Sequence, residues 1–257
     1  RRNKNPMQPK LKSKVRCTDR EVGEVTRVIM DPLSLQISHI VVGGNGAGGR
    51  VVLWPAEGAV SADFVDLLAE SGCQWIASGE GVLRNSLGAE GDAPEARQKW
   101  LYRPYRIEGQ QAPVTAFFRD DRLSDLIGFE YAKWHGKDAA AHFVAELDAI
   151  ARHAGDTDAR PVVSIILDGE NAWEYYPYNG FYFLDELYAA LESRPGLRSA
   201  TFAMLLDERR ESVPLPGLVA GSWVYGNLAT WIGAADKNRA WDLLCAAKRN
   251  FDLVIAS

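Results

Sequence analysis

The sequence predicts an α/β fold in which helices cover a parallel sheet or barrel, preceded by a short all-β segment. After residue 50, short apolar runs bounded by polar residues or glycine alternate with amphipathic stretches of helical length. Before residue 45, apolar residues are interspersed with polar ones, and Asp31-Pro32 signals a turn between two strands. A chain of 257 residues is long enough for one large domain with a small companion.

The first part, residues 1–44, is predicted to be a basic terminus followed by a β-segment too small to be stable alone. Seven basic residues and no acidic residue lie between Arg1 and Arg16. A solvated terminus is the favoured interpretation, and contact with phosphate or anionic lipid is the alternative. Residues 45–50 are predicted to be a glycine-rich linker. Gly44–Gly49 fits G-x-G-x-x-G, but an apolar strand follows where a dinucleotide site needs a helix.

The second part, residues 51–257, alternates predicted strands with predicted helices. Ser61 is expected to cap a helix that runs to Glu70. A polar, exposed loop is expected at residues 87–98. Strands are predicted at 50–55, 73–78, 114–120, 161–169 and 199–205, and further helices at 137–153, 181–192 and 237–248.

Composition excludes several classes of protein. The net charge of −5 argues against a nucleic-acid binder with one basic face, and no apolar stretch is long enough to span a bilayer. Three widely spaced cysteines without a C-x-x-C motif predict a reducing, cytoplasmic compartment and no structural zinc. The four histidines show no paired-ligand spacing, so a histidine-based metal site is not expected. No cofactor is predicted.

Two carboxylates follow predicted strands at the edge where α/β folds place their chemistry. Glu57 comes shortly after residues 50–55, and Asp168 ends the apolar run 161–169 and precedes many aromatic residues. Sugar rings stack on aromatic side chains, and an apolar neighbourhood raises the pKa of a general acid. The alternatives are a solvated loop glutamate and an aromatic core with a structural aspartate. Two carboxylates at roughly 5–5.5 Å would suit a retaining glycosidase.

Arg119 and Asp120 end another strand, and Arg119 is suited to orienting a carboxylate or a sugar hydroxyl. Trp223, Trp231 and Trp241 follow later in the chain, and each is interpreted as core more readily than as a ligand platform.

Four long stretches resemble glycoside hydrolase family 57, the α-amylase and 4-α-glucanotransferase group. They are "WPAEGAVSADFVDLLAESGCQWIASGEGVL", "FFRDDRLSDLIGFEYAKW", "SIILDGENAWEYYPYNG" and "GSWVYGNLATWIGAADKNRAWDLL". Residues 51–257 would then form a partial (β/α)₇ barrel. The segment "KLKSKVRCTDREVGEVTRVIMDPLSLQISHIVV" resembles the opening half of a PRC-barrel domain.

The family resemblance implies a retaining enzyme that acts on α-glucans or maltooligosaccharides without a metal. It implies Glu57 as nucleophile and Asp168 as acid/base. The residues expected to bind substrate are Trp54, Glu80, Arg119, Asp120, Glu170, Trp173 and Trp223. Hydrolysis and transfer stay open.

The chain also departs from the family pattern. It lacks the His-Gln-Pro tripeptide, has Gly79 before Glu80 where relatives have Asp, and has Asp121 where they have His. Two alternatives to an enzyme therefore stand. One is a catalytically impaired barrel fragment that binds glucan or a partner. The other is a module whose basic terminus and β-segment bind RNA or protein. An unpaired barrel edge would also favour self-association.

Overall fold

The computed structural model describes residues 14–16, 21–30, 37–43, 51–53, 55–92, 96–109, 112–154, 160–168 and 172–255. The described part of the first 44 residues is an antiparallel three-stranded sheet in the order β1-β2-β3. Its strands are β1 (Lys14–Arg16), β2 (Glu21–Met30) and β3 (Ile37–Gly43). Val25 pairs with Val42 and Val28 with Ile40, so the predicted β-segment is present. The predicted linker at 45–50 lies outside the described residues.

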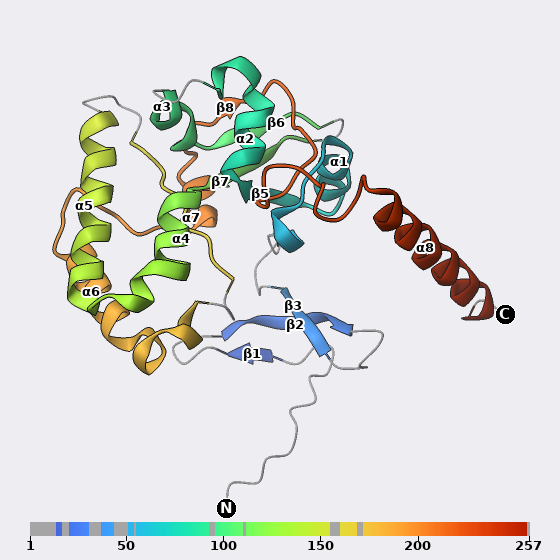
Figure 1. The fold of residues 1–257 in the computed structure, drawn as a ribbon, viewed down its shortest axis with the longest axis horizontal. Helices are drawn as coiled ribbons and strands as arrows, with labels where there is room; N and C mark the ends of the chain where they lie inside the picture. Colours follow the sequence, from blue (N-terminus) through green and yellow to red (C-terminus); the bar gives the residue numbers. More distant parts are fainter. Residues whose placement is uncertain are drawn as a thin grey trace, which may run out of the picture.

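The second sheet has the order β4-β5-β7-β6-β8 (Figure 1). β4, β5 and β7 run parallel, as the alternation of strands and helices predicted. β6 is antiparallel to β7, which the sequence analysis did not anticipate. Among the described residues β4 and β8 are edge strands, so this is an open sheet. The bounds are β4 (Val51–Leu53), β5 (Cys73–Gly79), β6 (Tyr105–Ile107), β7 (Val114–Arg119) and β8 (Val213–Pro214).

Helices pack around this sheet, and several begin where the sequence predicted. The Ser61 hydroxyl accepts a hydrogen bond from the Phe64 N–H at 3.3 Å and caps α1 (Ala62–Glu70). α5 (Gly136–Ala154) and α6 (Phe181–Glu192) lie side by side (Figure 1) and match the predicted helices closely. The remaining helices are α2 (Glu80–Leu87), α3 (Arg97–Leu101), α4 (Asp121–Asp125), α7 (Phe202–Asp207) and α8 (Ala235–Ile255).

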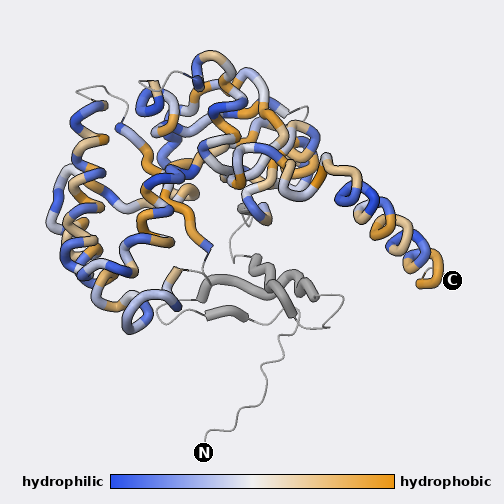
Figure 2. The backbone as a smooth tube through the Cα atoms, in the orientation of Figure 1, coloured by the Kyte–Doolittle hydropathy of each residue, from blue (hydrophilic) through white to orange (hydrophobic). Residues whose placement is uncertain are grey.

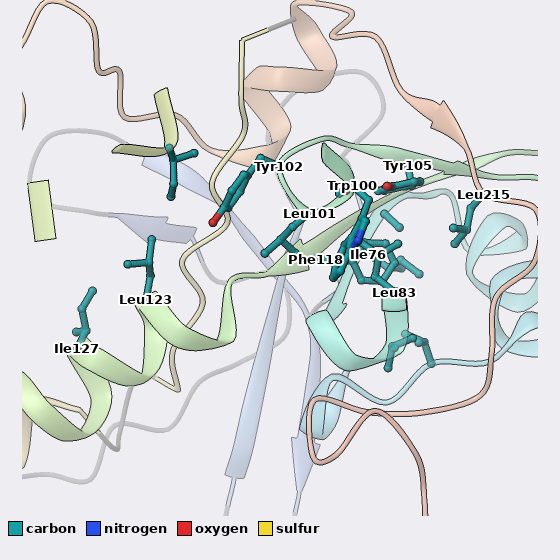
Figure 3. Packing of buried hydrophobic residues seen from close by; sticks show 14 of the residues in the cluster. Ile76, Leu83, Trp100, Leu101, Tyr102, Tyr105, Phe118, Leu123, Ile127 and Leu215 are labelled. Carbon is teal, nitrogen blue, oxygen red and sulfur yellow. Dashed lines mark hydrogen bonds between the residues drawn. The ribbon is translucent and has the colours of Figure 1, made fainter. Parts of the chain in front are cut away.

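The sheet buries different residues on its two faces because side chains alternate along each strand. One face packs against the helices and forms the main core (Figure 3), which includes Ile76, Leu83, Phe118 and Leu123. On the opposite face, Ala77 and Phe117 form a smaller hydrophobic cluster with Leu205 of α7. Trp75 and Phe202 pack against this cluster. The rings of Phe117 and Phe202 stack at 4.2 Å.

Three predictions about local structure need correction. Residues 199–205 were predicted as a strand, but α7 begins at Phe202, because the Thr201 hydroxyl accepts a hydrogen bond from the Met204 N–H and caps a helix. A seven-residue apolar run does not distinguish the two structures. Residues 161–169 were also predicted as a strand, but the described part, 160–168, contains a single bridge, between Arg119 and Ser164. The predicted loop 87–98 contains a 3₁₀ turn at Gly88–Glu90 and the start of α3.

α8 is longer than the predicted helix 237–248 and projects away from the rest of the described fold (Figure 1). Hydrophobic and hydrophilic residues are interspersed along it (Figure 2), and Trp241, Leu244 and Phe251 are exposed. Within the described part of the chain, no helix combines the length and apolar character needed to cross a membrane.

Candidate active site

Glu57 lies on a tight turn directly after β4. The turn is the 3₁₀ segment Ala56–Gly58, in which Glu57 has a φ of 56° and a ψ of 21°. This left-handed backbone is uncommon for a residue with a side chain and is often found at functional sites. The buried hydroxyl of Ser78 donates a hydrogen bond to the Gly58 carbonyl at 2.6 Å. This hydrogen bond anchors the turn to β5, while the Glu57 side chain is exposed.

A distant loop around Trp223 holds the same turn from the other side. The Trp223 indole N–H donates to Glu57 Oε2 at 2.8 Å, and the Trp223 backbone N–H donates to the Glu57 carbonyl at 3.2 Å. Val60 and Gly221 form an antiparallel bridge beside these contacts. Trp223 thus donates hydrogen bonds to both the side chain and the backbone of Glu57.

Glycines allow this loop to lie directly on the end of β5. A Cβ atom on Gly79 would lie 2.5 Å from the Trp223 Cα, and one on Gly81 would lie 2.9 Å from the Gly226 Cα. No side chain fits in that space. The close approach of the Trp223 backbone therefore explains why position 79 is a glycine in this chain.

Arg119 is buried at the end of β7, and each of its nitrogen atoms donates a hydrogen bond. Nε donates to the Ile166 carbonyl at 2.9 Å, Nη1 to Asp121 Oδ1 at 2.9 Å, and Nη2 to Asp125 Oδ1 at 2.6 Å. Its Cζ atom also lies 5.2 Å from the centre of the Trp223 ring, within the range of a cation–π contact.

A cavity of about 310 Å³ opens beside this arginine. Asp168, at the end of the described segment 160–168, lines it together with Arg119 and Trp223. Three of the predicted site residues therefore share one cavity, and a fourth, Glu57, is bonded to Trp223. The other lining residues are Asp121, Asp125, Gly128, Phe129, Leu167, Ala172 and Val224.

The cavity has an acidic lining, with three aspartates and one arginine. Burial raises the pKa of Asp121 to about 6, against the opposing effect of Arg119, and the charges of Glu80 and Asp125 add to the rise. Asp121 thus retains a proton at a higher pH than an ordinary aspartate. Neither Asp121 nor Asp125 was predicted from the sequence to belong to the site. Both follow Arg119-Asp120 within six residues, and this proximity was the available signal.

Glu80 and Asp120 do not line the cavity, although both were predicted to bind substrate. Glu80 accepts two hydrogen bonds from Arg97, at 2.5 and 2.6 Å, and Arg97 also donates to Asp120 Oδ1 at 3.0 Å. The fully buried Asp120 accepts further hydrogen bonds from the Tyr102 hydroxyl and the Leu123 N–H. Burial and the charge of Asp120 raise the pKa of the Tyr102 hydroxyl. We call these four side chains the Arg97 cluster.

Trp173, another predicted substrate contact, lies in the 3₁₀ segment Trp173–Tyr175 and packs on Tyr176 with ring centres 5.5 Å apart. It is half-buried and does not line the cavity. Trp54 and Glu170 lie outside the described residues. Among the residues that the structure describes, no three His, Cys, Asp or Glu side chains are grouped as a metal ion would require.

The model of glycosyl hydrolase family 57 matches residues 50–211, which include Glu57, Arg119 and Asp168. Nothing in the comparisons supports the PRC-barrel resemblance of the preceding segment. Proteins with curated functions show no match to this sequence.

Solved structures show the same kind of fold. The chain is similar to a 4-α-glucanotransferase of Thermococcus litoralis, with 19% identity and a TM-score of 0.51 over 77% of this chain. An α-amylase of Thermotoga maritima matches 78% of this chain with 17% identity and a TM-score of 0.56. A branching enzyme of Thermococcus kodakaraensis matches 66% with 16% identity and a TM-score of 0.53. The chain spans 28%, 47% and 39% of these three proteins, respectively.

Proposed function

The chain belongs to glycosyl hydrolase family 57, and from this premise we propose that it cleaves or transfers α-linked glucose units with retention of configuration. Glu57 is the proposed nucleophile and Asp168 the proposed acid/base. One observation carries the proposal: Trp223 lines the same cavity as Asp168 and donates its indole hydrogen bond to Glu57. The two carboxylates come from distant parts of the chain; Trp223 is hydrogen-bonded to Glu57 and lines the same cavity as Asp168.

The reaction follows from the chemistry of the two carboxylates. A Glu57 oxygen attacks the anomeric carbon of an α-glucoside, and the bond to the leaving oxygen breaks as that oxygen takes a proton from Asp168. This step leaves a covalent glucosyl ester on Glu57. Asp168, now a carboxylate, takes a proton from water or from a sugar hydroxyl, whose oxygen then displaces Glu57. Water as acceptor gives hydrolysis, and a sugar gives transfer.

The surroundings suit these roles. The indole hydrogen bond engages Oε2 of Glu57, so Oε1 is the oxygen assigned to attack. Phe129, Leu167 and Val224 line the same cavity as Asp168 and make part of its wall apolar. The ring of Trp223 offers a flat surface of the kind on which a sugar ring stacks.

The test is sugar release from maltooligosaccharides, amylose and pullulan by the wild-type chain and two variants. We expect Glu57→Gln to lose turnover by roughly 10⁶-fold, the order of loss when a catalytic nucleophile is removed. Asp168→Asn should lose about 10²–10⁴-fold, the range for a general acid. With an activated aryl glucoside, whose leaving group needs little protonation, the Asp168→Asn variant should lose much less in the first step.

Glu90→Gln is the matched control, because Glu90 is an exposed carboxylate on the turn after α2. This variant should keep full turnover. Unchanged activity in Glu57→Gln would refute the assignment of the nucleophile. A folded wild-type chain without turnover would refute the enzymatic proposal and favour the alternative of a glucan- or partner-binding protein.

A further inference from the structure

We propose that Arg119 and Trp223 form a positioning pair that sets the distance between Glu57 and Asp168, instead of contacting substrate through their polar groups. This inference rests on the proposed function, because it concerns how the two carboxylates are held. Both residues were expected from the sequence to bind substrate. Their hydrogen bonds in the structure point to a different role.

The polar atoms of Arg119 are occupied by protein groups. Arg119 is 7% exposed, and its guanidinium donates hydrogen bonds to one carbonyl and to two carboxylates. Three of the five guanidinium N–H groups are therefore directed at protein acceptors, and the two bonds to carboxylates are charge-assisted and strong. Arg119 is thus arranged to hold protein segments together.

One of those segments carries the proposed acid/base. The Ile166 carbonyl, which accepts from Arg119 Nε, lies two residues before Asp168. The same segment is held at the Ile166 N–H, which donates to the buried Ser124 hydroxyl at 3.2 Å, and at the Ser164 carbonyl, which accepts from the Asp120 N–H at 2.9 Å. Residues 160–168 have only one bridge to β7, so these contacts replace the ladder that a strand would have.

The other segment carries the proposed nucleophile. Trp223 receives the Arg119 guanidinium over its ring and donates its indole N–H to Glu57 Oε2. Its backbone N–H also donates to the Glu57 carbonyl, which fixes the left-handed residue of the turn. A continuous path therefore runs from Asp168 through the Ile166 carbonyl, Arg119 and Trp223 to Glu57.

The proposed reaction depends on the distance between Glu57 and Asp168, which this path fixes. A retaining mechanism needs the carboxyl groups about 5–5.5 Å apart, and a shift of about 1 Å can reduce turnover by about 10²-fold. Glu57 lies on an exposed turn and Asp168 at the end of an irregular segment. Neither position is held by a regular sheet ladder, so the pair supplies the rigidity that the backbone lacks.

The experiment compares Arg119→Lys, Trp223→Phe and the double variant in the same turnover assay. Lysine keeps the charge, but its donors all lie on one nitrogen and cannot reach the three separate acceptors of the guanidinium. Phenylalanine keeps an aromatic ring but lacks the indole N–H. Each single variant should lose roughly 10- to 100-fold in kcat with KM for maltooligosaccharides changed less than about twofold. The double variant should lose little more than the worse single variant, because both act on one path.

Trp241→Phe is the matched control, since the Trp241 indole also donates to a protein oxygen, the Trp231 carbonyl, at 3.0 Å on the surface of the molecule. It should leave kcat unchanged. A rise in KM with unchanged kcat in Trp223→Phe or Arg119→Lys would overturn the inference and make these residues substrate contacts. If the losses in kcat of the two single variants add fully in the double variant, the two residues do not act on one path, and the inference is overturned. If Glu57→Gln retains activity or the wild type is inactive, the proposed function itself fails, and the positioning role fails with it.

Discussion

Two arginine–carboxylate clusters lie next to each other in this protein and differ in what else they contact. In the Arg97 cluster, Arg97 binds Glu80 and Asp120, and the Tyr102 hydroxyl donates to Asp120. In the second cluster, Arg119 binds Asp121 and Asp125, lines the cavity and packs on Trp223. The neighbouring residues Asp120 and Asp121 belong to different clusters. The same residue types in one short stretch thus contribute to the protein interior and to the candidate site.

This difference shows that a charged pair beside a candidate site need not belong to it. The Arg97 cluster connects α2, α3 and the start of α4, and its central carboxylate is fully buried. The Arg119 cluster is partly open, because Asp125 is exposed and Asp121 lines the cavity. We therefore expect changes in the first cluster to act on stability, with the larger effect there, and changes in the second to act mainly on turnover.

The largest effect is expected when the Arg97 cluster loses its cation. Arg97→Ala leaves Glu80 and the buried Asp120 without their guanidinium. Because Arg97 is partly exposed, we expect a loss of about 3 kcal/mol in the free energy of unfolding, the lower end of the cost of breaking a buried pair. Urea denaturation measures this loss. Arg106→Ala, which removes an exposed pair with Glu108, should cost about 0–1 kcal/mol. Equal losses in the two variants would contradict the structural role.

A smaller effect is expected where the Trp223 loop touches β5. Gly79→Ala places a Cβ atom 2.5 Å from the Trp223 Cα, so the loop must move. We expect a loss of about 1–3 kcal/mol in the free energy of unfolding, as in overpacked sites, together with reduced turnover. Gly196→Ala serves as the control, because no atom lies within 4 Å of its added Cβ. Normal turnover in a folded Gly79→Ala variant would count against a link between this contact and Glu57.

The smallest effect is a pH dependence in the Arg119 cluster. The pKa of Asp121 is raised from 3.8 to about 6, so the folded chain holds this proton more tightly than the unfolded chain. The resulting stabilisation is fully present below pH 3.8 and is lost as the pH rises to about 6. Asp121→Asn cannot titrate, so its stability relative to the wild type should rise between pH 4 and pH 6, by about 1 kcal/mol after allowance for partial exposure. Unfolding curves at pH 4, 5, 6 and 7 measure this; a pH-independent difference would refute it.

Much of the fold followed from local patterns. α1 begins after Ser61 because a serine hydroxyl caps a helix, and β5 and β7 form where short apolar runs predicted strands. Glu57 and Asp168 were both predicted to follow strands. Glu57 does follow β4, whereas Asp168 ends a segment that has a single bridge to β7. The short strand β6 and the capped helix α7 were missed, since short segments with little periodicity carry a weak signal.

The hydrogen-bond partners of the charged residues could not be predicted from local sequence patterns. The sequence alone determined which residue types stand at the strand ends, where the main helices lie and which family the chain resembles. Only the tertiary structure decided that Glu80 and Asp120 bind Arg97, and that Trp223 bonds Glu57 from 166 positions away. Local patterns reflect backbone geometry and periodic burial, which act over a few residues. A hydrogen bond between distant residues depends on how loops pack, here on glycines such as Gly79 that let the Trp223 loop rest on β5.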